Sequence, residues 1–396
     1  MFGLFHLVVF LLSALLWMLQ GAWNTRAAAW DMSPLSIGLL NFVSYILYVA
    51  SALLVAPRSD KWGAKKPMAM GLALFAAALL TGLLWTSPAW LFVTAGLSTV
   101  FYGFFFPCAE GLFSRMEAME GADPAGTTSR FSLSYSAGNI FGMVSGPALI
   151  IAHPGWIFAG GTALCLALSA SVALHFRRHG ERLPGAYGKA SRSEDAATAT
   201  RAATTARRLR GAARAGLLAA TLAFFGMMFL YPKIMLSQGF SAGSVGLYAA
   251  WGNIAVFFVF LVMARARFWI GRPAITSAVS SLALALFAAA FAMPLSPFVF
   301  ALIPALGGTA YAVAYTFAIY YGLHTPDADN AKQGAIHETL IGLGIGTGPL
   351  AAGALMGVCG SWRALGILCA LLAAASWAAQ AFLARRGEGE ISQLSD

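Results

Sequence analysis

The sequence predicts an all-α integral membrane protein in which twelve transmembrane helices form two parallel six-helix repeats. First, 59% of the 396 residues are hydrophobic and only 10% are charged, whereas about a quarter of the residues of a soluble domain are charged. Second, the apolar residues form runs that can cross a bilayer, which takes about 20 helical residues. Third, short motifs recur between the two halves of the chain at a nearly constant offset.

The apolar segments define both the helices and the domains that we expect. They lie at 3–22, 34–56, 67–86, 89–113, 131–152, 156–176, 214–232, 243–264, 272–293, 297–321, 333–358 and 362–384. The predicted domains are an N-terminal half at 1–176, a cytoplasmic linker at 177–213, a C-terminal half at 214–384 and a cytoplasmic tail at 385–396. The linker is rich in Ala, Thr and Arg and has no apolar face, so we expect it to be flexible.

The basic residues predict the orientation of these helices. With the segments above, Arg26, Lys233 and Arg363 fall on one side and the remainder of the 25 Lys and Arg residues on the other. Because positive residues stay in the cytoplasm, both termini should be cytoplasmic, in what we expect to be a bacterial inner membrane. The net charge of +10 is then an orientation signal, and we expect the bilayer rather than nucleic acid as the partner.

Two pairs of motifs indicate an internal repeat. SPLSIGLL at 33–40 and SAGSVGLY at 241–248 share the pattern S-x-x-S-[IV]-G-L. GMVSGP at 142–147 is matched by GIGTGP at 344–349. The copies occur in the same order, so the second half should repeat the first in parallel orientation.

The charged stretch APRSDKWGAKK at 56–66 resembles the loop between helices 2 and 3 of the major facilitator superfamily. The match is partial, because Ala56 and Ala64 replace a glycine and a basic residue of that motif. The resemblance covers essentially the whole chain and implies a transporter that works by alternating access. It also implies that Asp60 latches the two halves together near the start of helix 11. Gly63 should allow the tight turn between the two helices.

The segment GNIFGMVSGPALI at 138–150 resembles the helix 5 motif of exporters in this family that exchange substrate for protons. The residues expected to bend helices 5 and 11 are Gly142, Gly146, Pro147, Gly348 and Pro349. The alternative is that the glycines only allow close helix packing, which is common in membranes. Thr99 stands where the family's proton-coupled exporters carry an arginine.

Ionisable residues within membrane helices are costly and therefore point to function. The candidates for proton coupling or gating are Glu110, His337, Glu338, Asp60 and Arg115. The alternative for Glu110 is a salt bridge with Arg115, and for Glu338 a structural carboxylate. Asp31 precedes helix 2, where we expect it to cap the helix.

In this family the substrate cavity is lined mainly by helices 1, 4, 7 and 10. The polar and aromatic residues expected to bind substrate there are Trp17, Gln20, Asn24, Thr99, Tyr102, Phe106, Met228, Tyr231, Tyr311 and Tyr315. No Arg or Lys lies near the middle of these segments, so a neutral, amphipathic or weakly cationic organic solute fits better than an anion.

The sequence therefore favours proton-coupled export of a small organic solute. Proton-coupled or facilitated uptake and a non-transporting membrane sensor are the alternatives. An enzyme is not expected: HETLI at 337–341 lacks the second histidine of a zinc motif, and no phosphate loop occurs. The four cysteines are isolated, so we expect neither metal nor cofactor. We expect the protein to be a monomer.

Overall fold

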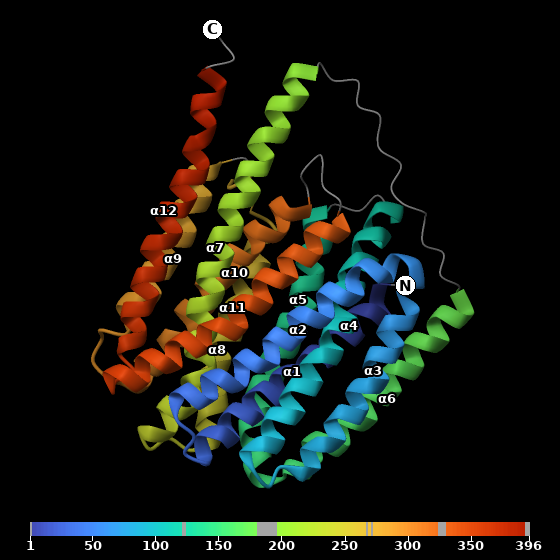
Figure 1. Ribbon diagram of the computed structural model, residues 1–396, viewed down its shortest axis with the longest axis vertical. Coiled ribbons are helices and arrows are strands. Elements are labelled where there is room, and N and C mark those ends of the chain that lie inside the picture. Colours follow the sequence, from blue (N-terminus) through green and yellow to red (C-terminus); the bar gives the residue numbers. More distant parts are fainter. Residues whose placement is uncertain are drawn as a thin grey trace.

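The computed structural model describes residues 2–120, 124–179, 196–266, 268–270, 272–323 and 330–392, with some helix-end side chains outside that description. Its helices form one elongated bundle (Figure 1). They are α1 (Phe2–Ala29), α2 (Pro34–Trp62), α3 (Lys65–Leu80), α4 (Pro88–Glu120), α5 (Pro124–Ala152), α6 (Pro154–His179), α7 (Ala196–Ser237), α8 (Ala242–Met263), α9 (Pro273–Ala290), α10 (Pro297–Leu323), α11 (Asn330–Cys359) and α12 (Ala364–Ser392), with a short 3₁₀ helix, η1 (Thr81–Leu84).

The all-helical prediction is confirmed, and the chain is a multi-pass integral membrane protein. In the described part of the chain, eleven helices are long and apolar enough to cross a membrane. The apolar part of α9, Ala274–Ala290, is shorter than the other spans. Side chains on many of these helices expose large apolar groups, as expected for surfaces that face lipid tails.

Two residue types determine where the helices begin. Six helices begin at a proline, namely α2, α4, α5, α6, α9 and α10, because proline lacks the N–H that a first turn leaves unpaired. The repeated S-x-x-S motif caps one helix in each half. The hydroxyl of Ser33 accepts a hydrogen bond from the backbone N–H of Ser36 at 3.1 Å, and Ser241 does the same for Ser244 at 3.2 Å. The two copies of the motif thus have the same local structure.

The linker region differs from the sequence-based expectation. Helix α7 begins at Ala196, so residues 196–213, which we assigned to a flexible linker, are its first turns. Alanine and arginine have high helix propensity, so a polar extension of an apolar helix remains helical. Figure 1 shows α7 and α12 projecting together on the side where the C-terminus lies. The boundary of the linker is therefore corrected at its C-terminal end. The predicted turn between α2 and α3 is present, with Gly63 at a φ of 73°.

Glycines bring the helices of each half into backbone contact. In the first half α5 packs along α1, and a side chain at Gly142 would clash with the carbonyl oxygen of Ala14. In the second half α11 packs along α7, and a side chain at Gly348 would clash with the carbonyl oxygen of Leu222. Both helices continue past Pro147 and Pro349. The repeated G-x-x-x-G-P motif thus has the same packing role in both copies.

The contacts between the first six and the last six helices also follow one repeated pattern. Helix α2 packs on α11, and its Gly38 lies against the backbone of Pro349. Helix α8 packs on α5, and its Gly246 lies against the backbone of Val144. Gly38 and Gly246 are the glycines of the repeated S-x-x-S-[IV]-G motif. One motif therefore both caps a helix and holds it against the other half.

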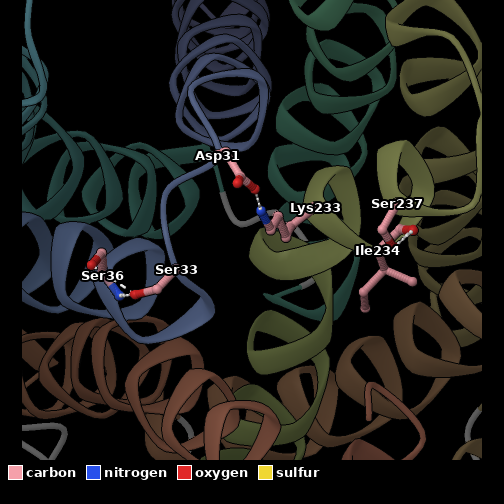
Figure 2. Close-up of polar contacts among 6 residues, drawn as sticks. All are labelled: Asp31, Ser33, Ser36, Lys233, Ile234 and Ser237. Carbon is pink, nitrogen blue, oxygen red and sulfur yellow. Dashed lines mark hydrogen bonds and ion pairs between the residues drawn. The ribbon is translucent and has the colours of Figure 1, made fainter. Parts of the chain in front are cut away.

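An ion pair joins the halves at the end of the bundle that is predicted to face outward. The Lys233 ammonium donates to the Asp31 carboxylate, and Figure 2 shows the two side chains pointing toward one another. The expectation that Asp31 caps α2 was wrong, because Ser33 is the cap and Asp31, with a φ of 53°, turns toward α7. The hydrogen bond from Lys233, together with its charge, holds the pKa of Asp31 below its usual value.

The glycine contact between α1 and α5 predicts a matched pair of stability effects. Gly142→Ala should lower the free energy of unfolding by about 1–3 kcal/mol, because the new methyl group overpacks the interface. Gly160→Ala, on α6, adds a methyl group that meets nothing within 4 Å and should not destabilise the protein. Thermal unfolding in detergent measures both. Equal melting temperatures for the two variants would contradict the close contact.

The ion pair predicts a change in accessibility at the outer end of the bundle. In a variant without its native cysteines, a reporter cysteine at the buried position Thr25 should react faster with an impermeant maleimide after Asp31→Asn, by up to about fivefold, because exposed ion pairs are weak. Acidification weakens the same ion pair but also slows labelling by protonating the thiol, so the ratio of the Asp31→Asn rate to the unmodified rate, compared at one pH, should fall toward one at low pH. Since the pKa of Asp31 is lowered, the contribution is present above the ordinary carboxyl pKa of about 3.9 and is lost as the pH falls.

Ser36→Ala is the control for that experiment. It removes a hydroxyl in the first turn of α2 that contacts Ser33 at 2.8 Å but leaves the contact between the halves intact. A labelling rate in Asp31→Asn no faster than in Ser36→Ala would show that the ion pair does not restrain the outer end.

Candidate functional site

A cavity of about 110 Å³ lies between the first six and the last six helices. Its walls come from α1, α2, α4 and α5 on one side and from α7, α8, α10 and α11 on the other. The lining residues are Ser13, Leu16, Trp17, Tyr45, Tyr48, Thr99, Tyr102, Phe106, Phe131, Tyr135, Asn139, Phe225, Asn253, Val256, Tyr311, Tyr315, Glu338, Ile341 and Ile345. They lie in the middle of their helices or nearer the predicted cytoplasmic end, while the Asp31–Lys233 pair is at the opposite end.

Six of the residues that the sequence nominated for substrate binding line this cavity: Trp17, Thr99, Tyr102, Phe106, Tyr311 and Tyr315. The rings of Tyr102 and Phe106 stack with centroids 5.0 Å apart. The hydroxyl of Tyr102 donates to the carbonyl oxygen of Leu12 at 3.0 Å. That bond fixes the ring of Tyr102 against α1, so the ring presents a preformed flat surface to the cavity.

The other four nominated residues are buried away from the lining. Gln20 supports the wall indirectly, because its amide donates to the hydroxyl of Tyr45. The amide of Asn41 donates to Asn24 at 2.8 Å and joins α1 to α2. The hydroxyl of Tyr231 donates to the carbonyl oxygen of Phe300, and Met228 packs near Gly252 of α8. Their polar atoms and rings are used in helix packing.

Aromatic rings from the two halves meet around the cavity. Trp17 lies 5.9 Å from Phe225, and Tyr135 lies 6.0 Å from Tyr315, measured between ring centroids. Tyr311 lies 5.7 Å from Tyr315 and continues this surface along α10. A flat ring entering the cavity would therefore find aromatic partners in both halves.

Glu338 connects the halves through a hydrogen bond. Its carboxylate is buried, lines the cavity and accepts a hydrogen bond from the hydroxyl of Tyr48 on α2. The neighbouring His337 is also buried, and its ring packs edge-on against Tyr315 at 4.9 Å. Neither ring nitrogen of His337 has a hydrogen-bond partner among the described residues. A titratable carboxyl group thus lies where the two halves and the cavity meet.

The remaining nominated residues are three charged residues and the glycines and prolines of α5 and α11. The side chains of Asp60, Glu110 and Arg115 lie outside the described part of the structure. The glycines and prolines expected to bend α5 and α11 lie in the helix contacts described above.

Reasoning from the sequence missed Ser13 and Phe225 on helices that it did consider, and six further polar or aromatic residues of the lining: Tyr45, Tyr48, Phe131, Tyr135, Asn139 and Asn253. These six lie on α2, α5 and α8, which are not among the helices that the family resemblance gives as the main walls of the cavity. One signal was present: both asparagines occur in the tripeptide Gly-Asn-Ile, each within a membrane-spanning helix. An amide in such a helix is costly unless it has a role.

The chemistry of the lining favours binding over catalysis. Of the lining residues that the structure describes, Glu338 is the side chain that can carry a charge at neutral pH, and none is Lys or Arg. Within the described residues, no group of three or more His, Cys, Asp and Glu side chains is placed to hold a metal ion. The cavity therefore offers rings, hydroxyls and amides to a small organic molecule, with one acidic group beside them.

Known structures share this architecture. The nucleoside transporter NupG matches with a TM-score of 0.60 and 18% identity, covering 96% of this chain and 98% of that chain. A bacterial homologue of the human drug peptide transporters PepT1 and PepT2 matches with a TM-score of 0.60 and 14% identity, covering 98% and 99%. At these identities the likeness establishes the fold alone. No curated protein matches the sequence significantly.

The family is established by the sequence itself. The family model of the Major Facilitator Superfamily matches residues 5–336. This match covers more than half of the chain. The helical bundle and the structural relatives agree with that match. The chain belongs to the Major Facilitator Superfamily.

Proposed function

We propose that this protein is a proton-coupled transporter that moves a small neutral, amphipathic or weakly cationic organic solute by alternating access. The observation that carries the proposal is the buried carboxyl group of Glu338, which lines the cavity and is bonded to Tyr48 across the two halves. A proton that neutralises this group would change both the cavity and the contact between the halves. Such a double effect is what coupled transport requires.

The lining of the cavity supports this class of substrate. Ring faces on both sides favour a flat or apolar group, and they also attract cations. Glu338 adds a negative charge when it is ionised, whereas the described lining has no basic side chain to hold an anion. The titles of the structural relatives name nucleosides and peptides as cargo of those proteins, which agrees with a small organic solute but does not identify it.

Export is the direction that we propose. The support is the helix 5 segment with Gly142, Gly146 and Pro147, whose glycine positions pack on α1. Uptake by symport uses the same cavity and the same carboxyl group. The two modes differ in whether solute moves against or with the proton, so liposome transport under an imposed pH gradient decides between them. A sensor would move neither.

Coupling through Glu338 predicts a separation of two fluxes. Glu338→Gln should reduce solute-driven proton movement by about tenfold or more, a factor typical of linked sites, while solute exchange without a pH gradient continues. Both fluxes can be followed in liposomes, with a pH-sensitive dye inside and labelled solute outside. Solute-driven proton movement equal to that of the unmodified protein would rule out Glu338 as the coupling group.

Tyr48→Phe tests the bond across the halves in the same assay, and we expect it to shift the pH dependence of transport. The matched control is Tyr321→Phe. The Tyr321 hydroxyl is also buried, but it donates to the backbone carbonyl of Trp269 at 3.2 Å. The control should keep the pH dependence of the unmodified protein.

The charge of the lining predicts which solutes bind. Benzyl alcohol, benzylamine and benzoate share one ring and differ in charge, so they form a matched set. A ligand present at about 100 times its Kd stabilises the folded state by about 2.7 kcal/mol. In a thermal unfolding assay, the neutral and cationic members should raise the melting temperature more than benzoate does. Preferential stabilisation by benzoate would contradict the proposed substrate class.

A further inference from the structure

Two asparagines of the cavity wall have buried amide atoms without partners. Asn139 on α5 and Asn253 on α8 are 5% and 1% exposed, and both line the cavity. The Oδ1 atom of Asn139 and the Nδ2 atom of Asn253 have no hydrogen-bond partner among the described residues. Buried polar groups in proteins are nearly always bonded, so unpaired ones on a cavity wall indicate an absent partner.

The two asparagines lie at the same depth on neighbouring helices. Helices α5 and α8 pack against each other in antiparallel directions. Gly246 lies against the backbone of Val144 toward one end, and the rings of Tyr135 and Phe260 lie 5.8 Å apart toward the other. Asn139 and Asn253 fall between these two contacts on their helices. One belongs to each half of the transporter.

Glycines hold the backbone at both positions. Gly138, directly before Asn139, lies against the carbonyl oxygen of Phe10 on α1. Gly252, directly before Asn253, packs with its carbonyl oxygen against Gly308 on α10. These backbone contacts leave little freedom for either helix to rotate. The amides are thus preorganised, which is the property expected of a recognition site.

We infer that Asn139 and Asn253 form an amide pair that recognises a solute with an N–H donor beside a C=O acceptor on a flat ring, such as a ring lactam or an aromatic carboxamide. The Oδ1 atom of Asn139 accepts from the N–H of the solute, and the Nδ2 atom of Asn253 donates to its carbonyl. The rings of Tyr135 and Tyr315 provide the flat contact surface.

This inference rests on the proposed function and narrows its substrate class. Recognition by the two asparagines does not need Glu338, because the N–H and C=O groups of the solute that they bind are uncharged. Since the two asparagines come from different halves, a solute bonded to both also bridges the halves. The N–H donor should matter most, because a site built to bond a donor rejects analogues that lack it.

Matched probes test the inference on the purified full-length protein. The probes are uracil, nicotinamide and benzamide, each paired with the analogue whose amide N–H groups are all methylated. The paired rings are otherwise alike. We expect at least one parent compound to bind about tenfold or more tightly than its methylated partner, measured by isothermal titration calorimetry. If no parent compound is preferred to its methylated partner, the inference is overturned.

Asn139→Leu and Asn253→Leu assign that preference to the two residues. Each variant should lose most of the preference for the N–H compound. Neither should clearly lower the melting temperature of the empty protein, because leucine is similar in size and one of the two polar atoms that it replaces had no partner among the described residues. A preference kept in both variants, or a clear loss of stability, would show that the asparagines have a structural role instead.

The binding test of the amide pair and the transport test of Glu338 can fail independently of each other. If the amide preference is absent but solute-driven proton movement still depends on Glu338, the inference fails and the transport proposal stands. If the amide compounds bind with the expected preference but no solute moves protons, the recognition site stands and proton coupling fails.

Discussion

Close backbone contact between helices is the constraint on which the rest of this bundle depends. Lipid tails are as apolar as leucine, so the hydrophobic effect does little to bring membrane helices together, and packing must replace it. Here Gly142 rests on α1 and Gly348 on α7, where any side chain would collide with a carbonyl oxygen. Each half is therefore assembled around a contact in which two helices touch through their main chains. Such a contact is stiff, which suits a half that moves as one body.

The contacts between the halves are of two kinds. Gly38 and Gly246 bring helices of opposite halves together toward the outer end. Around the cavity the halves meet through side chains, such as the ring pair of Tyr135 and Tyr315 and the bond from Tyr48 to Glu338. Side-chain contacts can be broken and remade without disturbing a helix. Main-chain contacts therefore lie within each half and toward one end of the interface between the halves, and the exchangeable side-chain contacts lie around the cavity, where solute and proton would act.

The sequence predicted the fold because it depends on patterns that a single chain displays: apolar runs, the distribution of basic residues and two copies of each motif. It predicted part of the cavity because Tyr102 and Tyr311 lie on helices that the family resemblance gave as cavity walls. It could not separate Tyr311 from Tyr231, because both are tyrosines in apolar helices and only the packing decides which one faces the cavity. Asn139 and Asn253 escaped notice because their role depends on two helices from different halves lying side by side.

Two contacts between the halves at the end predicted to face outward respond differently to dissolved salt. The backbone contact at Gly38 is uncharged, so dissolved ions leave it unchanged. The Asp31 carboxylate, by contrast, is 94% exposed and meets Lys233 in water, where counterions weaken attraction over a Debye length of about 8 Å at physiological ionic strength. The ionic strength of the medium at this end, which is predicted to face outward, therefore changes how strongly the ion pair holds the two halves together, whereas it leaves the glycine contact beside it unaffected.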